Sequence, residues 1–484
     1  MKNHVIIGAG PAGLTAGWEL VKLNKQCTIV EKEKEFVGGI ARTVVYKGYR
    51  FDLGGHRFYT KSEIIEKKWQ EMLPKDFIKV PRLSRIYYNK KFFPYPIEIK
   101  STLLNLGIVK SFNIGLSFIL AKIRPRKPEL SFEDWVVNRF GYELYSTFFK
   151  SYTEKVWGIK CEKINKDWAG QRIRGLSLLD AVKDALFKKK PQKGKEIKTL
   201  IKRFYYPRLG PGQLWESVRD EIVSKGNEVI MGRKVVECVH DNGIMKKIIL
   251  DNMQEIGGDE FYSTMTLKDL INSLNPKAPE EVLNAANRLS YRDFMLIALI
   301  IDKEDIFPDN WIYVHDPDVK VGRIQNFKNW SKEMLADNSK TCIGMEYFCN
   351  TTDEFWSRPD DELIELAKVE LEKIGLATID ICIDGSVVRN ENTYPIYDND
   401  YKENLNIIKK WLNGYFKNLY PAGRGALHNY NSQDHSMMAA ILSVKNMIGD
   451  PFVDVWEINT DSEYAEEGNS DSKIEQRLVP KEIE

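Results

Sequence analysis

Three glycines near the start of the chain are spaced for binding phosphate groups. Gly8, Gly10 and Gly13 form a G-x-G-x-x-G turn between an apolar strand and a helical segment. In such a turn the glycines allow a tight bend, a close approach of backbone to pyrophosphate, and close packing of helix on strand. Glu31 ends the next strand, where its carboxylate can accept hydrogen bonds from both hydroxyls of a ribose. Together these residues predict a dinucleotide site.

A second glycine-rich stretch narrows the choice of dinucleotide. Gly38 and Gly39 lie just beyond the ribose carboxylate, an extension that resembles FAD enzymes of the glutathione-reductase and amine-oxidase type. No second glycine fingerprint for a nicotinamide follows. The glycines of Gly54-Gly55-His56 would let the backbone approach a flavin ring, with His56 beside it. We therefore expect bound FAD, contacted by Gly55 and His56.

Strand and helix patterns alternate along the rest of the chain. Residues 4–31 read as one βαβ unit, and Ser131 with its following acidic residues is placed to begin a helix. Helical spacing is found over 61–72, 101–186 and 360–374, a hairpin pattern over 80–99, and strand-like alternation over 290–350 and 380–397. Mixed elements of this kind predict an α/β protein with more than one layer.

Composition excludes several classes of protein. The chain has 484 residues, 43% hydrophobic and 29% charged, so disorder, collagen and coiled coils are excluded. Lys and Arg number 71 against 69 acidic residues, so no overall field favours nucleic acid or an anionic membrane. Six scattered cysteines without a CxxC pair argue against a disulfide framework or a metal site. With no signal-peptide pattern at the N-terminus, we expect a cytoplasmic protein.

Three further segments are distinctive in composition. Residues 112–123 are strongly apolar, but they are fewer than the ~20 that a spanning helix needs, so we expect burial in a helical domain and no membrane insertion. Residues 183–203 carry nine cations and predict a solvated loop. The tail from Glu457 is polar and acidic, and we expect little chemistry there.

Several longer stretches are more specific than a glycine triplet. They are GGHRFYTK at 54–61, FPYPIE at 93–98, SFEDWVVNRFG at 131–141, VWGIKCEKINKDWAGQR at 156–172, FYYPRLGPGQLW at 204–215, WIYVHDPDVKVGRIQNF at 311–327, TYP at 393–395, GRGALHNY at 423–430 and QDHS at 433–436. Through them, the chain resembles UDP-galactopyranose mutases of the eukaryotic type, colinearly from Gly8 to about Ile448. That family lies within the superfamily of FAD-dependent amine oxidases and protoporphyrinogen oxidases.

The resemblance implies an α/β fold. A Rossmann-type FAD-binding domain would be interleaved with a helical domain and an antiparallel β-sheet substrate domain. The implied segments are 1–60, 205–290 and 420–456 for FAD binding, 61–79 and 100–204 for the helical domain, 80–99 and 291–419 for the sheet domain, and 457–484 for a polar tail.

The resemblance also implies a reaction. The family interconverts the pyranose and furanose forms of a nucleotide-diphosphate sugar, UDP-galactose, without net redox. Reduced FAD attacks the anomeric carbon through N5, and NADPH or NADH is the implied reductant. Arg172 and Arg323 would stabilise the departing diphosphate, with His56 at the flavin. The other matched positions are Tyr95 against the uracil, Trp157 at the sugar, Tyr313, Tyr394 and Tyr430 at the diphosphate, and Arg424 near the flavin.

Substrate identity and reaction class stay open in the sequence. Glu98 replaces an amide that contacts uracil, and Thr153 replaces an Asn beside the sugar, so neither base nor sugar is fixed. The same fold also supports an oxidoreductase of the amine-oxidase or protoporphyrinogen-oxidase class. Two arginines among tyrosines would favour the mutase, whereas an aromatic cage without cations would favour the oxidoreductase. The oligomeric state is not fixed either.

Overall fold

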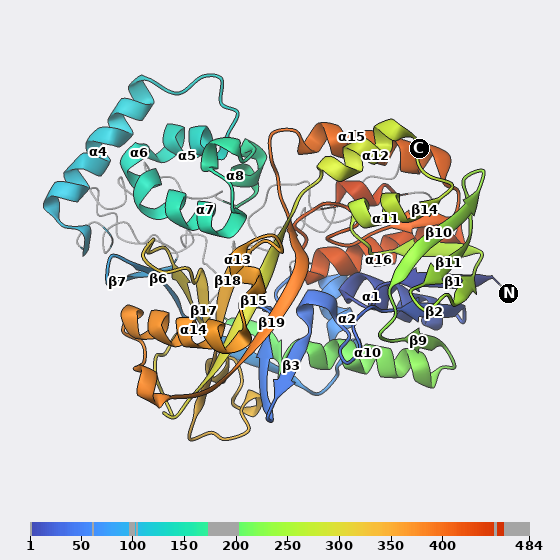
Figure 1. Ribbon diagram of the computed structural model, residues 1–484, viewed down its shortest axis with the longest axis horizontal. Helices are drawn as coiled ribbons and strands as arrows, with labels where there is room; N and C mark the ends of the chain where they lie inside the picture. Colours follow the sequence, from blue (N-terminus) through green and yellow to red (C-terminus); the bar gives the residue numbers. More distant parts are fainter. Residues whose placement is uncertain are drawn as a thin grey trace, which may run out of the picture.

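The computed structural model describes residues 2–60, 62–95, 102, 105–172, 203–449 and 453–458, with the backbone alone at 170–172. Glu98, the cationic residues 183–202 and the tail from 459 lie outside these residues. The predicted fold class is confirmed (Figure 1). A parallel sheet packed with helices lies on the right of Figure 1, a group of helices at the upper left, and a large, mostly antiparallel sheet below that group.

A five-stranded parallel sheet carries the glycine turn. Its strands, in spatial order, are β20 (Leu419–Pro421), β13 (Glu260–Ser263), β1 (Asn3–Ile7), β2 (Gln26–Val30) and β9 (Glu228–Ile230). Parallel strands need crossover connections, and α1 (Pro11–Lys22) provides the one from β1 to β2. It packs against α10 (Gly212–Ser224) and α16 (Gln433–Ile448). Val5, Ile6 and Ile7 are buried in this core, so the glycine turn begins from a fixed strand end.

A smaller sheet and four more helices extend the same core. The sheet orders β12 (Glu255–Gly257), β11 (Ile244–Leu250), β10 (Val235–Asp241) and β14 (Leu274–Asn275). The helices are α2 (Glu63–Met72), α11 (Leu267–Ser273), α12 (Glu280–Arg288) and α15 (Tyr401–Tyr415). A helix at 61–72 was expected in the helical domain, but α2 buries Ile65 and Trp69 beside α1 and α10. Its amphipathic face therefore belongs to the core of the parallel sheet.

The large sheet has seven strands. They are ordered β19 (Cys382–Pro395), β15 (Tyr291–Ile301), β18 (Thr341–Cys349), β17 (Arg323–Asn326), β16 (Trp311–Val314), β6 (Ser84–Tyr88) and β7 (Lys91–Pro94). All neighbours are antiparallel except β16 and β6. The predicted hairpin over 80–99 is confirmed as β6 and β7. The alternating stretches are confirmed as strands, and the helix at 360–374 as α14 (Asp360–Ile374).

Strand β15 serves two hydrophobic cores. All eleven of its residues are buried. Phe294 and Leu296 belong to the core that faces the helices, whereas Met295 and Ile297 belong to the core beneath α14. This two-residue alternation is what a strand buried on both faces requires. Smaller pairs join β3 (Thr43–Tyr46) to β4 (Tyr49–Asp52) and β5 (Phe77–Pro81) to β8 (Arg203–Pro207).

The helical region confirms one local prediction and contradicts another. It contains α4 (Ile108–Ile123), α5 (Phe132–Phe140), α6 (Tyr142–Leu144), α7 (Ser151–Trp157) and α8 (Lys166–Arg172). Ser131 caps α5 as predicted, in a reciprocal capping box with Asp134. Burial of the apolar residues 112–123 was wrong, because α4 lies at the outer edge and buries only Ile114 and Ala121. Among the described residues, no helix combines the length and hydropathy needed to cross a membrane.

Candidate active site

A cavity of about 1520 Å³ opens where the parallel sheet, the large sheet and the helical region meet. Its lining includes most residues proposed from the sequence, namely Gly8, Gly10, Glu31, Gly39, Gly55, His56, Tyr95, Trp157, Tyr313, Arg323, Tyr394, Arg424 and Tyr430. Gly13 and Gly38 are not part of that lining. Arg172 ends α8, but its side chain lies outside the described part of the chain.

One end of the cavity is built from backbone. The glycine turn runs from β1 into the N-terminus of α1, and a Cβ on Gly13 would lie 1.8 Å from the Gly8 carbonyl oxygen. Only glycine fits there, because helix and strand approach too closely for a side chain. Gly39 faces Gly10 across the opening, where a Cβ would lie 3.3 Å from the Gly10 Cα. The space in front of the α1 N-terminus is therefore bordered by glycines.

Glu31 fixes this turn as well as facing the cavity. It is buried just after β2, and its Oε2 accepts a hydrogen bond from the Ala9 backbone N–H at 2.6 Å. Its Oε1 accepts one from the Glu33 backbone N–H at 2.9 Å. A carboxylate offers about four lone-pair sites, so two stay for ribose hydroxyls. Arg42, which we did not single out in the sequence, is buried nearby and donates to the Gly39 carbonyl at 2.9 Å.

A buried carboxylate anchors the segment that leads to His56. Asp52 ends β4, and its oxygens accept hydrogen bonds from the Thr43 hydroxyl at 2.8 Å and from the Tyr206 hydroxyl. Burial raises the pKa of Asp52 to about 7, even though both hydrogen bonds favour the ionised form. The Gly54-Gly55 backbone follows directly and lines the cavity. These contacts hold the segment against β3 and β8.

His56 carries no charge at neutral pH. One ring nitrogen, Nε2, lies 3.1 Å from the Leu53 carbonyl oxygen. Burial lowers the pKa of His56 to about 4, and the positive charges of Arg424 and Arg323 add to the effect. A neutral imidazole near two guanidinium groups can take part in hydrogen bonds without adding a third cation.

Arg323 is held by a buried carboxylate on the neighbouring strand. The register of β17 and β18 pairs Arg323 with Glu346, whose side chain is fully buried. Arg323 Nε donates to Glu346 Oε2 at 2.6 Å, and Gln325 Nε2 donates to Glu346 Oε1 at 2.7 Å. Arg323 Nη2 also donates to the Tyr394 hydroxyl at 3.1 Å. Burial opposes the charge, but Glu346 outweighs it and holds the pKa of Arg323 well above its ordinary value.

Aromatic rings form the wall beside this ion pair. Tyr394 and Tyr430 are stacked, with ring centroids 5.5 Å apart and planes 16° apart. Trp157 meets both edge-on, at 6.3 and 6.1 Å. The Arg424 guanidinium lies 4.8 Å from the Tyr430 ring centroid, and its Nε and Nη2 donate to the Asn431 carbonyl at 2.9 and 2.8 Å. This wall therefore combines π faces, phenol hydroxyls and a cation.

A second aromatic cluster lies at the Tyr95 side of the cavity. Tyr95 and Tyr313 have ring centroids 4.7 Å apart. Tyr152 meets Tyr313 at a right angle, at 5.7 Å, and stacks on His315 at 4.4 Å. Flat rings in this arrangement suit a planar ligand such as a nucleobase.

Several residues that line the cavity or support its walls were not predicted from the sequence. They are Arg42, Arg57, Tyr152, Trp168, Gln325 and Glu346. Glu346 had a usable signal, since a carboxylate inside the apolar strand 341–349 must be paired if it is buried. Trp168, 4.4 Å from Trp157, stood inside a matched block. Tyr152 had no signal, because a helical tyrosine is usually a core residue.

The residues present fit FAD in two places. The glycine-bordered N-terminus of α1 suits a pyrophosphate, since helix N-terminal N–H groups and the helix dipole favour anions. The unused lone pairs of Glu31 suit the adenosine ribose. The cavity then continues past Gly54 and Gly55 to His56, which leaves a path bordered by backbone for a flavin.

A family model matches the first part of the chain. Residues 6–73 match the model of the family described as NAD(P)-binding Rossmann-like domain. A 1-hydroxycarotenoid 3,4-desaturase of Flavobacterium sp. (strain P99-3) is 43% identical over 58 residues, 12% of either chain. The match thus spans about an eighth of the length of that relative.

Two solved structures are similar to the chain over nearly its whole length. A reduced UDP-galactopyranose mutase superimposes with a TM-score of 0.79, covering 93% of this chain and 96% of the other, at 19% identity. A putative protoporphyrinogen oxidase from Exiguobacterium sp. 255-15 superimposes with a TM-score of 0.71, covering 92% of this chain and 98% of the other, at 15% identity. The chain has their fold. Fold alone does not choose between their activities, because one fold can carry different active sites.

Proposed function

We propose that the protein is a FAD-dependent enzyme that interconverts the pyranose and furanose forms of a nucleotide-diphosphate sugar, with UDP-galactose the first candidate. The observation that carries the proposal is that the glycine turn and Arg323 line the same cavity, and that tyrosine hydroxyls lie beside Arg323. Cationic and phenolic donors suit a diphosphate leaving group, because charge-assisted hydrogen bonds to phosphate are strong. Similarity to the fold of a reduced mutase supports it.

The chain would hold the cofactor and set its electrostatic surroundings. Reduced FAD, when bound, supplies a nucleophilic nitrogen for the anomeric carbon and is returned unchanged, so NADPH or NADH would serve only to reduce it first. The α1 N-terminus and Glu31 would bind the pyrophosphate and ribose of FAD. His56 would face the ring as a neutral hydrogen-bonding group, while Arg424 would supply positive charge nearby.

Arg323 would bind the diphosphate of the substrate. Glu346 and Tyr394 engage its Nε and Nη2, which leaves the Nη1 donors for a phosphate oxygen. Tyr394, Tyr430 and Tyr313 would add hydroxyl donors. Because Glu346 offsets the charge of Arg323, a leaving group with about two negative charges needs further cations. We assign that role to Arg172 and Arg424.

The two aromatic regions would separate sugar from base. Trp157 and Thr153 lie on α7 beside the stacked tyrosines, where a sugar ring would contact them. Tyr95 and Tyr313 would hold the base between flat faces.

One observation favours a second candidate, an oxidoreductase of the amine-oxidase or protoporphyrinogen-oxidase class. The stacked Tyr394 and Tyr430, with Trp157 at their edges, form an aromatic wall that would also suit an amine or an apolar substrate. The fold shared with a putative protoporphyrinogen oxidase is compatible with this activity. The arginines of the cavity lining, among them Arg57, Arg323 and Arg424, count against it, because an apolar substrate gains nothing from guanidinium groups.

A direct assay separates the two candidates. The holoenzyme is reduced anaerobically with dithionite, NADPH or NADH and incubated with a panel of UDP- and dTDP-hexoses, and products are resolved by chromatography. We expect pyranose–furanose interconversion only after reduction. A hydride reagent added during turnover should trap a flavin product whose mass identifies the sugar. Turnover of amines or porphyrinogens by the oxidised enzyme, with release of peroxide and no sugar interconversion, would reject the mutase.

A further inference from the structure

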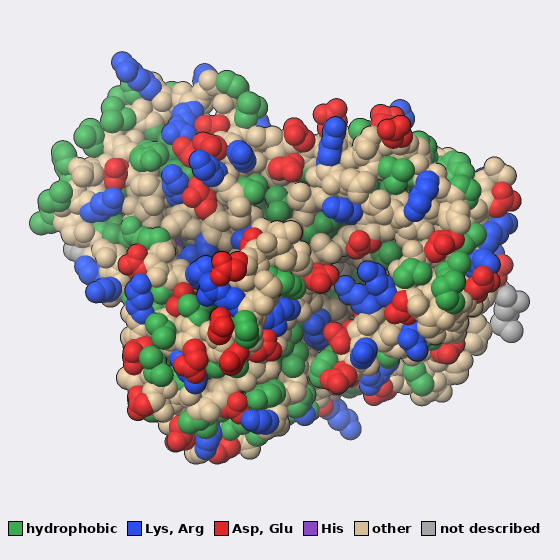
Figure 2. Space-filling view, in the orientation of Figure 1, with side chains coloured by type: hydrophobic (Ala, Val, Ile, Leu, Met, Phe, Trp, Pro, Cys, Tyr) green, Lys and Arg blue, Asp and Glu red, His purple; other side chains and the backbone are tan. Residues whose placement is uncertain are grey.

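The outward face of α4 exposes a continuous apolar stripe. Its members recur at helical spacing and are Ile108 (89% exposed), Val109 (77%), Phe112 (69%), Leu116 (48%), Ile119 (53%), Leu120 (54%) and Ile123 (68%). Among the described residues, eight large apolar side chains are more than half exposed, and only Met253 lies outside 108–130. Figure 2 shows hydrophobic side chains gathered along the upper-left edge, which α4 occupies in Figure 1. Scattered apolar residues are normal on surfaces, but a contiguous stripe marks an interaction site.

The position of α4 on the molecule is fixed from its inner side. Ile114 and Ala121 are buried against the helical region. Gly141 lies so close that a Cβ there would stand 2.7 Å from the Phe118 backbone nitrogen. The close approach of backbone to backbone directs the opposite face of α4, which carries the stripe, toward solvent.

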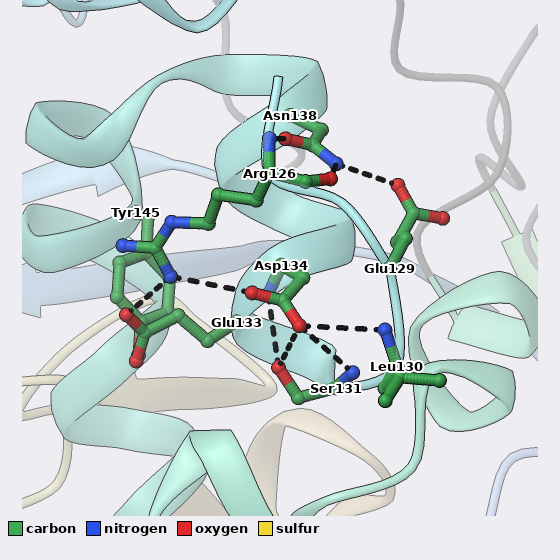
Figure 3. Close-up of polar contacts among 8 residues, drawn as sticks. All are labelled: Arg126, Glu129, Leu130, Ser131, Glu133, Asp134, Asn138 and Tyr145. Carbon is green, nitrogen blue, oxygen red and sulfur yellow. Dashed lines mark hydrogen bonds and ion pairs between the residues drawn. The ribbon is translucent and has the colours of Figure 1, made fainter. Parts of the chain in front are cut away.

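The segment after α4 is also anchored. Arg126 Nη1 donates to Glu133 Oε1 at 2.7 Å, and Glu133 Oε2 accepts from the Tyr145 hydroxyl at 2.8 Å (Figure 3). Asn138 Nδ2 donates to the Arg126 carbonyl, and the Arg126 N–H donates to Asn138 Oδ1. These bonds attach the end of α4 to α5, so the stripe belongs to a rigid part of the helical region.

The segment of chain that carries the stripe has charges of one sign. Residues 99–128 contain no Asp or Glu, although the chain as a whole is nearly neutral at +2. Lys110 is paired with Glu143 and Arg126 with Glu133. Lys122, Arg124 and Lys127 are exposed at the C-terminal end of α4 and have no ion pair with any described residue. An apolar face with a cationic rim matches a surface that is apolar inside and anionic outside.

We infer that α4 lies in the interface of a membrane containing anionic phospholipid, with its stripe among the acyl chains and its cations at the headgroups. A helix of 16 residues is about 24 Å long and lies along a bilayer surface rather than across it. A second copy of the chain is the less suitable occupant, because a symmetric contact would bring two sets of like cations together.

Vesicle co-sedimentation of the full-length holoenzyme tests this inference. We expect binding to vesicles of phosphatidylcholine with phosphatidylglycerol, at least tenfold stronger than to phosphatidylcholine alone and weakened by salt. Replacing Ile108, Phe112 and Ile119 together by Ser should reduce binding at least tenfold. Lys122→Glu, Arg124→Glu and Lys127→Glu together should remove the preference for anionic lipid. Turnover in solution should stay unchanged, because neither triple variant touches the cavity.

A matched control separates the stripe from general surface hydrophobicity. The triple change of Val236, Met253 and Val369 to Ser removes side chains 46%, 75% and 50% exposed elsewhere, and should leave binding unchanged. Absence of binding to anionic vesicles, or equal loss in the control variant, would overturn the inference. So would a wild-type dimer in sedimentation velocity that the Ile108, Phe112 and Ile119 variant dissociates, with no vesicle binding by either protein.

A site-specific label gives a second readout that does not depend on large substitutions. All six cysteines are buried, so a thiol-reactive NBD dye should label Leu116→Cys selectively. We expect a blue shift of its emission on addition of anionic vesicles, and quenching by lipids with a spin label on the acyl chain. The same dye at Met253→Cys should respond to neither. An unchanged spectrum at position 116 in saturating vesicles would contradict burial of the stripe.

Discussion

The two ends of the cavity are made by different physical means. At the glycine turn, backbone groups and one carboxylate, Glu31, shape the site within about 40 residues of chain. At the opposite wall, side chains from β17, β18, β19, α7 and the loop 423–431 meet, and a buried ion pair between Arg323 and Glu346 holds them in place. The first end needs the absence of side chains, and the second needs charges that are compensated.

This difference separates the expected consequences of mutation. Changes at the glycine-turn end should act mainly on cofactor affinity, because the hydrogen bonds of Glu31 come from the nearby backbone of Ala9 and Glu33. Changes at the Arg323 wall should couple turnover to folding, since Glu346 supports two cavity side chains, Arg323 and Gln325.

The largest expected effect is on stability, from Glu346→Ala. Removing one partner of a buried ion pair leaves an uncompensated charge, so the free energy of unfolding should fall by about 3–5 kcal/mol in a urea titration. Glu346→Gln keeps the shape of the side chain, and its free energy of unfolding should lie between those of wild type and Glu346→Ala. The control is Glu354→Ala, an exposed carboxylate paired with Arg358, which should cost less than about 1 kcal/mol. Equal losses of stability at both positions would contradict the role of Glu346 as a buried partner that compensates the charge of Arg323.

Turnover should respond most to Arg323→Ala. Loss of the guanidinium should raise the activation free energy of the sugar reaction by about 2–4 kcal/mol, or roughly 30- to 1000-fold in kcat, while FAD absorbance is retained. Arg323→Lys keeps a charge for Glu346 but lacks the planar fork. Compared with Arg323→Ala, this variant should regain more of the stability than of the activity. Unfolding and the mutase assay on the same preparation measure the two. Full activity in either variant would contradict a role for Arg323 at the diphosphate.

The loop 423–431 should make the stability of the fold depend on pH. The ring of His428 is buried against Tyr291 and Tyr397, and burial lowers its pKa from the usual 6.5 to about 4. The unfolded state therefore binds the proton first as pH falls, and the stabilising contribution present above pH 6.5 is lost progressively down to pH 4. The free energy of unfolding of wild type, minus that of His428→Gln, should drop by up to about 3 kcal/mol between pH 7 and pH 4. A flat difference would contradict a neutral, buried His428.

Cofactor retention should respond to Glu31→Ala. Two backbone N–H groups, of Ala9 and Glu33, would lose their acceptor, and the ribose of FAD would lose its partner. We expect FAD affinity to fall by about 1–3 kcal/mol, roughly 5- to 150-fold, in a fluorescence titration of the apoprotein. Glu35→Ala, at an exposed position outside the lining of the cavity, is the control and should change affinity little. Normal FAD affinity with reduced turnover would show that Glu31 acts on the reaction, as proposed for Arg323, and not on cofactor binding.

The smallest effect is expected outside the cavity, from Ser131→Ala. Loss of the capping box at α5 should cost about 1 kcal/mol of stability, with no change in FAD affinity or turnover at saturating substrate. Ser224→Ala, at an exposed position on α10, should lower the free energy of unfolding by less than Ser131→Ala does. A selective loss of turnover in Ser131→Ala would show that the helical region acts on the chemistry and not only on the fold.

The same contrast explains what could be predicted from the sequence. The turn at Gly8, Gly10 and Gly13 and the carboxylate Glu31 follow from local spacing, because one βαβ unit places them. Arg323, Tyr394 and Tyr430 were proposed through resemblance, since nothing in their local sequence distinguishes a cavity tyrosine from a core one. Glu346 was missed, although a carboxylate between apolar strand residues is a signal for a buried partner.

The error at α4 has a different physical origin. An apolar stretch such as 112–123 predicts that something covers it, but not that the cover belongs to the same chain. Periodicity placed the helix correctly and left its surroundings undefined. Only tertiary packing shows that α5 and α6 cover one narrow face.

Strand β15 sets a limit on how the molecule can come apart. Since alternate side chains of this one strand belong to two cores, neither the layer beneath α14 nor the layer that faces the helices can melt while the other keeps its packing. Calorimetry of the apoprotein should therefore record these two layers as a single cooperative transition, and hydrogen exchange should find the amides of β15 among the slowest in the protein.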